Sequence, residues 1–275
     1  MPVSERQLAA FADQIPRRIP LDTSPRHLAG AGDARHVTHA LAAAGWDRTS
    51  DPFSPEIILS SPDGRFTLHF DPQSVTSAWW RLRAAPTGTE PGWYAEFGEL
   101  VPAEILGRLT DALTAPPPPQ PPDPLQALES AGWLLSNATT AHSPDRMCHV
   151  ERCPDQEDLR GFWHVETCEP GHGTLLGPRI WHARFDGQVP DHLVAAFTTG
   201  LADPAPLQRG MFDRTAHHSV VQEPSPHTPE QVAAAHANRL NAIRAQARAA
   251  RRQQPARPTT ASPMTGTATR PAARR

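Results

Sequence analysis

Apolar and polar positions alternate and then take helical spacing at two places in this chain. In the first place, Trp93 and Phe97 lie on one side of an alternating stretch, and after Pro102 apolar residues recur every three or four positions. Alternation predicts a strand, and a proline followed by the wider spacing predicts the start of a helix. The same landmarks return 88 positions later, in the pairs Trp93 and Trp181, Phe97 and Phe185, Pro102 and Pro190, Leu113 and Leu201. The pattern therefore predicts a duplicated strand–turn–helix unit.

Each copy extends from this unit towards its N-terminus. In the first copy Asp33 is placed to cap a helix over 34–44, which Gly45 ends. A turn over 61–64, with proline second and glycine last, leads into an alternating strand over 66–70. Two more tryptophan pairs mark the same plan in both copies: Trp46 and Trp133, Trp80 and Trp163. We expect an α+β fold of two tandem domains, each an antiparallel sheet of about four strands covered by helices.

Composition divides the rest of the chain. Residues 116–124 are mostly proline, which predicts a stiff polyproline linker, with a proline-rich ligand for another protein as the alternative. Thr228 is placed to cap a helix that begins with Pro229. The predicted segments are an N-terminal segment (1–20), a first domain (21–115), the linker (116–124), a second domain (125–203), an irregular connection (204–227), a basic helix (228–253) and a disordered tail (254–275).

Several short motifs of the two copies match a known family. They are Leu28-Ala29-Gly30, Gly32-Asp33, Gly45-Trp46, Ser61-Pro62-Asp63, Gly92-Trp93-Tyr94, Phe97 and Pro102-Ala103-Glu104. With these residues the chain resembles the SPDY domain, the actinobacterial domain of unknown function 317 that is common in streptomycete proteins, over about 25–113 and 125–201. The Tyr of the family name is Gly64 in the first copy and Arg146 in the second. The resemblance implies a tandem arrangement and brings no activity, cofactor or catalytic residue with it.

Charge is distributed unevenly, although the formal net charge is only −3 at pH 7. All 26 basic residues are Arg, and over 228–275 nine Arg stand against one acid, Glu230, which leaves 17 Arg and 28 acids elsewhere. A basic tail on an acidic body either folds back or reaches an acidic partner. The candidate binding surface on the basic helix is Arg239, Arg244, Arg248, Arg251 and Arg252. Nucleic acid is therefore one partner class for this tail.

Cysteine usage and hydropathy indicate the compartment. The three cysteines are an odd number, which argues against a disulfide framework. The sequence shows no signal peptide and no apolar run long enough to span a bilayer. We therefore expect a cytoplasmic protein that does not associate with a membrane.

Residue types that bind zinc gather in the second copy. They are Cys148, His149, Cys153, His164, Cys168 and His172. Their spacing contains no Cys-x-x-Cys pair. Strand alternation also places His164 and Cys168 opposite the core-facing Trp163, while Cys148 falls on the core side. Side chains divided between two faces of a sheet do not meet at one ion, so we expect no bound zinc, and Cys148 is interpreted as a small buried apolar residue.

A glycine loop and several acids are the remaining chemical candidates. Gly30-Ala31-Gly32 precedes a helix, but the full glycine fingerprint is missing and Asp33 brings negative charge, so we interpret the loop as a tight turn. The acids considered for acid–base catalysis are Asp63, Glu96, Glu99 and Glu104. A shared active site would repeat polar residues in both copies, whereas the matching residues are Trp, Phe, Pro, Leu and Gly. We therefore expect no catalytic residue and no cofactor.

The repeated tryptophans have two interpretations. Core packing is the first, because aromatic side chains bury the most area in a small sheet-and-helix layer, and a ligand groove is the alternative. The leading functional hypothesis is a non-enzymatic cytoplasmic binding or adaptor protein with a protein partner. The alternative is a nucleic-acid-associated protein acting through the Arg-rich tail, and an enzyme ranks third.

Overall fold

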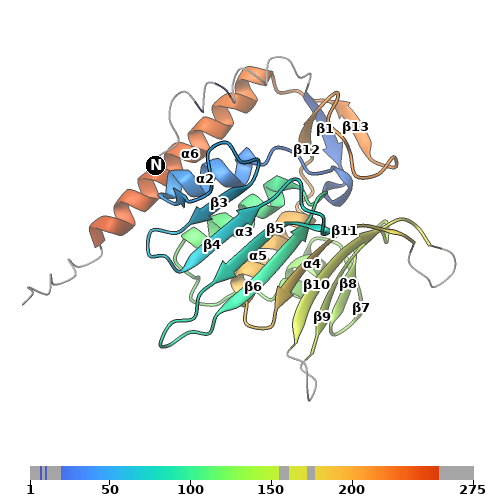
Figure 1. Ribbon diagram of the computed structural model, residues 1–275. Helices are drawn as coiled ribbons and strands as arrows, with labels where there is room; N and C mark the ends of the chain where they lie inside the picture. The colour runs from blue at the N-terminus through green and yellow to red at the C-terminus, as the bar shows by residue number, and fades with distance from the viewer. Residues whose placement is uncertain (1–6, 8–9, 11–19, 155–160, 172–176, 254–275) are drawn as a thin grey trace, which may run out of the picture.

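A computed structural model of the chain describes residues 20–154, 161–171 and 177–253, together with residues 7 and 10. The predicted disordered tail over 254–275 and most of the predicted N-terminal segment over 1–20 lie outside the described residues. A large sheet with its helices makes up most of the molecule, and a small sheet and a long C-terminal helix lie beside it (Figure 1).

In the part of the chain that the structure describes, both copies contribute to one antiparallel sheet of ten strands, in the order β2-β3-β4-β5-β6-β11-β10-β9-β8-β7. The first copy supplies β2 (Asp47–Arg48), β3 (Ile57–Ser60), β4 (Phe66–Phe70), β5 (Ala78–Ala84) and β6 (Trp93–Gly98). The second supplies β7 (Leu134–Asn137), β8 (Thr140–His142), β9 (Cys148–Cys153), β10 (Phe162–Cys168) and β11 (Arg179–Asp186). The prediction of a sheet of about four strands in each copy is therefore wrong, because each copy has five strands and the two sets are joined.

The junction between β6 and β11 has a local two-fold symmetry. The pairs in register are Glu96 with Arg184, Ala95 with Phe185, and Phe97 with Ala183. Phe185 and Ala183 are the repeat equivalents of Phe97 and Ala95. Exchanging the two copies therefore turns the pair Ala95–Phe185 into the pair Phe97–Ala183, as a two-fold axis requires. The junction pairs the N–H and C=O groups of two strands that would otherwise be sheet edges. The rings of Phe97 and Phe185 meet edge to face, 5.3 Å apart, on the core side.

The helices gather on one side of the large sheet (Figure 1). In each copy one helix precedes the strands and one follows: α2 (Arg35–Ala44) and α3 (Ala103–Thr114), then α4 (Pro124–Ser130) and α5 (Asp191–Ala202). Pro102 and Pro190, both with extended backbone, precede α3 and α5. On β5, Trp80 and Leu82 are buried towards the helices while Arg83 is exposed on the other side. The sheet therefore has a helix-covered face and a helix-free face.

The Ser-Pro-Asp turns of the two copies are built alike. In each, the serine hydroxyl donates a hydrogen bond to the aspartate and accepts one from an N–H of the next strand. The residues involved are Ser61, Asp63 and Phe66, and Ser143, Asp145 and Cys148. The residue after the aspartate, Gly64 or Arg146, has a left-handed φ of 72° or 59°. These bonds close a tight hairpin, so the motif has a structural role.

The segment predicted to be irregular, 204–227, contains two strands. β12 (Leu207–Gly210) and β13 (Val221–Pro224) pair with the two sides of β1 (Pro20–Ser24), and the three form a small antiparallel sheet. The prediction of an irregular segment is therefore wrong. Local spacing did not reveal these short strands, because their pairing partner β1 lies about 190 residues earlier in the chain. The 3₁₀ turn after β1, η1 (Arg26–Leu28), leads towards the glycine loop.

The C-terminal helix α6 (Pro229–Gln253) packs along α2 (Figure 1). Its apolar stripe is narrow, but Leu240 and Ile243 are buried against Ala40 and Ala43 of α2. Small alanine side chains allow the two helices to approach closely, so a few apolar residues are enough to hold the helix. Within the described residues no helix combines the length and the apolar character that crossing a membrane requires.

Candidate functional site

The repeated tryptophans lie in the core. All six are buried, and the most exposed of them, Trp133, is 6% exposed. They are Trp46, Trp80, Trp93, Trp133, Trp163 and Trp181, and Phe97 and Phe185 join the same cluster. Tryptophan side chains enclosed in this way do not line an open groove. A further tryptophan, Trp79, is only half-buried and lines a surface hollow.

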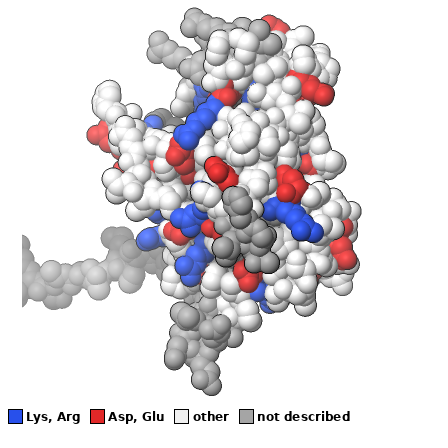
Figure 2. Space-filling view, turned by 90° about the vertical axis from the view of Figure 1, so that its right-hand side faces the viewer, with Lys and Arg blue, Asp and Glu red and all other residues white. Residues whose placement is uncertain are grey.

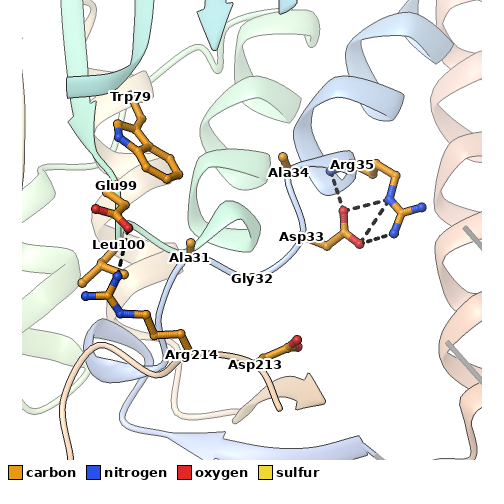
Figure 3. A pocket seen from close by; sticks show the side chains of 10 residues that line it. All are labelled: Ala31, Gly32, Asp33, Ala34, Arg35, Trp79, Glu99, Leu100, Asp213 and Arg214. Atoms are coloured by element: carbon orange, nitrogen blue, oxygen red, sulfur yellow. Dashed lines mark hydrogen bonds and ion pairs between the residues drawn. The ribbon is translucent and has the colours of Figure 1, made fainter. Parts of the chain in front are cut away.

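This hollow, of about 510 Å³, lies where the glycine loop before α2 meets β5 and the segment after β12 (Figure 3). Asp33 Oδ1 accepts a hydrogen bond from the N–H of Arg35, and its Oδ2 accepts one from the Arg35 guanidinium at 2.6 Å. Arg214 donates to Glu99 at 3.1 Å. An incoming phosphate would meet carboxylates already paired with these cations, so the geometry supports the interpretation of the loop as a tight turn. The helix begins at Arg35 with Ala34 at its N-cap position and no side-chain cap hydrogen bond, so the prediction that Asp33 caps it is wrong; Asp33 is held by Arg35 instead.

A buried ion pair connects the glycine loop to α3. Arg209 of β12 is 2% exposed, and its guanidinium donates to both carboxylate oxygens of Glu104 at 2.6 and 3.0 Å. It also donates to the carbonyl groups of Ala29 and Gly30 at 3.0 Å. Burial alone would raise the pKa of Glu104, but Arg209 and the nearby His36 hold it below its usual value. Glu104 is therefore a fixed carboxylate and not a proton donor.

A second hollow of about 510 Å³ between α3, α6 and β12 is also crossed by ion pairs. Arg26 and Arg108 both reach Asp203, at 3.0 and 3.3 Å. Arg239 of α6 donates to Asp111 of α3 at 2.7 Å and to the carbonyl of His36 at 2.8 Å. The pairs with Asp203 join the first copy to the end of the second, and the contacts of Arg239 attach α6 to α2 and α3 of the first copy. Arg239, predicted as part of a binding surface, is engaged in this attachment.

The other predicted binding residues of α6 differ in exposure. Arg244 is half-buried and donates to Asn241 at 3.1 Å. Arg248, Arg251 and Arg252 are exposed along the last turns of the helix. The structure thus divides the five predicted arginines, with three of them displayed together at one end of α6.

The helix-free face of the large sheet carries charged, histidine and aromatic side chains. One row across five neighbouring strands consists of Glu151, His164, Arg184, Glu96 and Arg81. The Arg184 guanidinium lies 4.4 Å over the Phe162 ring, and that of Arg83 lies 5.2 Å over the Tyr94 ring. On the side of the molecule drawn in Figure 2, Arg side chains are likewise interspersed with Asp and Glu.

A comparison with protein families matches the chain at two places. The model of SPDY, a domain of unknown function (DUF317), matches residues 60–119 and 142–207. The chain carries two SPDY domains. The prediction that the SPDY domain is present as a tandem pair is thereby confirmed. No curated protein and no solved structure matches the chain.

The two SPDY matches cover the same structural unit. Each begins at the Ser-Pro-Asp turn, continues through three strands and ends beyond the following helix: β4, β5, β6 and α3 in the first, β9, β10, β11 and α5 in the second. The strands that join the copies, β6 and β11, are the last strand of each unit. The residues that the two SPDY domains share therefore form the turn, the core and the junction.

One cluster of the second SPDY domain was missed by the sequence argument. His149, His164 and Glu166 meet on the helix-free face with their ligating atoms within 4.8 Å of one another. Cys148 lies in the core, on the face away from this cluster. Glu166 is not among the cysteines and histidines singled out in the sequence, although alternation along β10 places it on the same face as His164. His172 lies outside the described residues.

The three cysteines are free thiols. Burial raises the pKa of Cys148, which is fully buried, far above its usual value. Burial and the neighbouring Glu166 raise the pKa of Cys168 to about 11, and burial also raises that of Cys153. At neutral pH these side chains are protonated thiols, the opposite of an activated nucleophile.

Proposed function

We propose that the chain is a non-enzymatic adaptor of the cytoplasm that binds a protein partner on the helix-free face of its sheet. The junction of β6 with β11 carries this proposal. Because the copies join edge to edge, their helix-free faces merge into one surface that neither SPDY domain forms alone. Ten strands spaced about 4.8 Å apart make this surface roughly 45 Å wide. A surface of that width is large enough for a specific protein interface.

The side chains on this face suit a protein better than a nucleic acid. Arg184 over Phe162 and Arg83 over Tyr94 combine a cation with an aromatic surface, and arginine and aromatic residues are enriched in protein interfaces. Arg184 is also directly opposite Glu96. A phosphate backbone would gain most from cations without such acidic neighbours.

The ionisation states support binding over catalysis. The thiol of Cys168, with its pKa raised to about 11, is not poised for nucleophilic attack. Glu104, held as a carboxylate by Arg209, is not poised as a general acid. Three free cysteines also suit a reducing compartment.

The proposal is tested by locating the partner on the surface. A photo-crosslinking residue at position 83 should capture a protein from the native host, whereas the same residue at Gln126 on the exposed side of α4 should not. With the captured partner purified, Arg184→Ala should weaken binding tenfold or more, and Arg248→Ala, on α6, should leave it unchanged. Equal capture at both positions, or equal binding by both alanine variants, would rule out the helix-free face.

A second candidate function is nucleic-acid association through α6, and the exposed group of Arg248, Arg251 and Arg252 supports it. Deleting α6 is a poor test, because Leu240 and Ile243 hold this helix against α2. The better experiment compares wild type with the triple Arg→Gln variant in anisotropy titrations of duplex DNA at two salt concentrations. Each phosphate contact contributes about 0.9 to the steepness of the plot of log affinity against log salt concentration. If all three Arg contact phosphates, the slope of the triple variant should be shallower than that of wild type by about 2.7. Identical weak binding by both proteins would exclude this candidate.

A further inference from the structure

Three side chains that bind metals are brought together on β9 and β10 by strand pairing. Val165 faces Val150 across the two strands, and both are fully buried in the core. Their neighbours His149, His164 and Glu166 therefore point to the helix-free face. His149 lies directly opposite Glu166. His164 lies two residues before Glu166 on β10, so it is the diagonal neighbour of His149 across the two strands. The cluster is thus placed by two strands that are each paired on both sides.

The distances within the cluster suit a bound ion better than direct contact. His149 Nε2 lies 3.7 Å from Glu166 Oε2, which is longer than a hydrogen bond. In a tetrahedral zinc site, ligand atoms lie about 2.1 Å from the ion and hence about 3.4 Å from one another. The ligating atoms of all three residues already lie within 4.8 Å. Small side-chain rotations would bring them to the spacing that one ion requires.

Other polar side chains surround the cluster. Arg179 Nη1 lies 3.7 Å from Glu166 Oε1, the oxygen that does not face His149. The ring of His142, on β8, lies 5.9 Å from that of His149. His149 is only 8% exposed although it lies on the helix-free face. Partial burial and polar neighbours around the ligands are features of built metal sites.

We propose that His149, His164 and Glu166 form a binding site for a divalent transition metal of the zinc type. Two imidazole nitrogens and one carboxylate oxygen are a donor set that suits zinc, with a fourth position left for water or a group from a partner. The proposal replaces the expectation of no zinc, because the ligands come from one face of the sheet. It goes beyond the adaptor function and does not depend on it.

The test is a calorimetric titration of the full-length chain with Zn²⁺ after treatment with a chelator and exchange into metal-free buffer. We expect one ion per chain at micromolar protein. Glu166→Gln and His164→Gln should each weaken binding at least tenfold. The control is His218→Asn, which changes one of the two adjacent histidines His217 and His218 outside the large sheet, whose rings lie 4.0 Å apart, and it should leave binding unchanged. Co²⁺ should give visible absorption bands typical of nitrogen and oxygen ligands in wild type and in His218→Asn, and weaker bands in Glu166→Gln and His164→Gln.

Folding of the variants is checked by circular dichroism in metal-free buffer. Glu166→Gln preserves the shape of the side chain, so it carries the test even if His164→Gln misfolds. The proposal is overturned if wild type binds less than one Zn²⁺ per chain, or if Glu166→Gln binds as tightly as wild type. It is also overturned if His218→Asn removes the binding, because the ion would then lie elsewhere. None of these outcomes involves the protein partner, so the adaptor proposal fails or survives separately.

Discussion

Acidification should weaken the attachment of α6 to α2, because histidines are buried between these helices. His39 and His236 are 8% and 4% exposed, and Nδ1 of His39 lies 3.4 Å from Nε2 of His236. Burial lowers the pKa of His39 to about 4 and that of His236 to about 3, from 6.5 in an unfolded chain. The positive charges of Arg35 near His39 and of Arg239 near His236 lower these pKa values further, and the negative charge of Asp33 raises both.

The sign follows from proton uptake. Both folded-state pKa values lie below the unfolded value, so the unfolded chain binds more protons once the pH falls below 6.5. Stability is therefore present above that pH and is lost as the pH falls towards the folded values. Between pH 7 and pH 5 each histidine should cost about 2 kcal/mol, so the two together cost about 4 kcal/mol. That is a large part of the roughly 5–15 kcal/mol that stabilises a typical domain.

The assay is urea unfolding at pH 7 and pH 5, followed by circular dichroism, for wild type and a His39→Gln/His236→Gln variant. The two proteins should differ in their pH dependence by about 4 kcal/mol, because the variant lacks both titrating groups. His218→Gln, which changes an exposed histidine, is the matched control and should behave as wild type. Hydrogen exchange should also show α6 opening first as the pH falls. If wild type and the double variant lose the same stability on acidification, the argument from buried histidines is refuted.

Three further predictions concern stability at neutral pH. Phe97→Ala should cost about 3–5 kcal/mol in urea unfolding, because it leaves a cavity beneath the junction of the two SPDY domains; a cost below 1 kcal/mol would contradict the packing described. Arg209→Met should cost about 3–5 kcal/mol by leaving the buried Glu104 unpaired, and adding Glu104→Gln should recover part of that loss in a double-mutant cycle. Arg146→Gly should stabilise the protein by about 1 kcal/mol, measured as a higher melting temperature, because the left-handed φ at this position favours glycine.

Interactions between residues near in sequence could be predicted without the structure. The helix start at Pro229, the stop at Gly45 and the Ser-Pro-Asp turns depend on side chains within a few residues of one another. Alternation also placed Trp93 and Phe97 on one face of a strand, because a strand with one covered face repeats every two residues.

Only part of the candidate metal site could be predicted from the sequence. Alternation placed His164 on the face opposite Trp163, and the same rule applied to Glu166 would have added the third ligand. The position of His149 opposite Glu166 required the register of β9 against β10, which no periodicity specifies. The attachment of Arg239 to Asp111 was likewise invisible, since it depends on how α6 crosses α3.

The sequence by itself determined the repeated unit of strands and helices, its turns and its core-facing positions, because each depends on local spacing and backbone preference. Only the tertiary structure decided that β6 pairs with β11, that β1 lies between β12 and β13, and that Arg209 is buried against Glu104. The physical reason is that a strand edge offers the same N–H and C=O groups to any partner. The choice among partners is made by the packing of side chains that are distant in sequence, such as Phe97 on Phe185 at the junction.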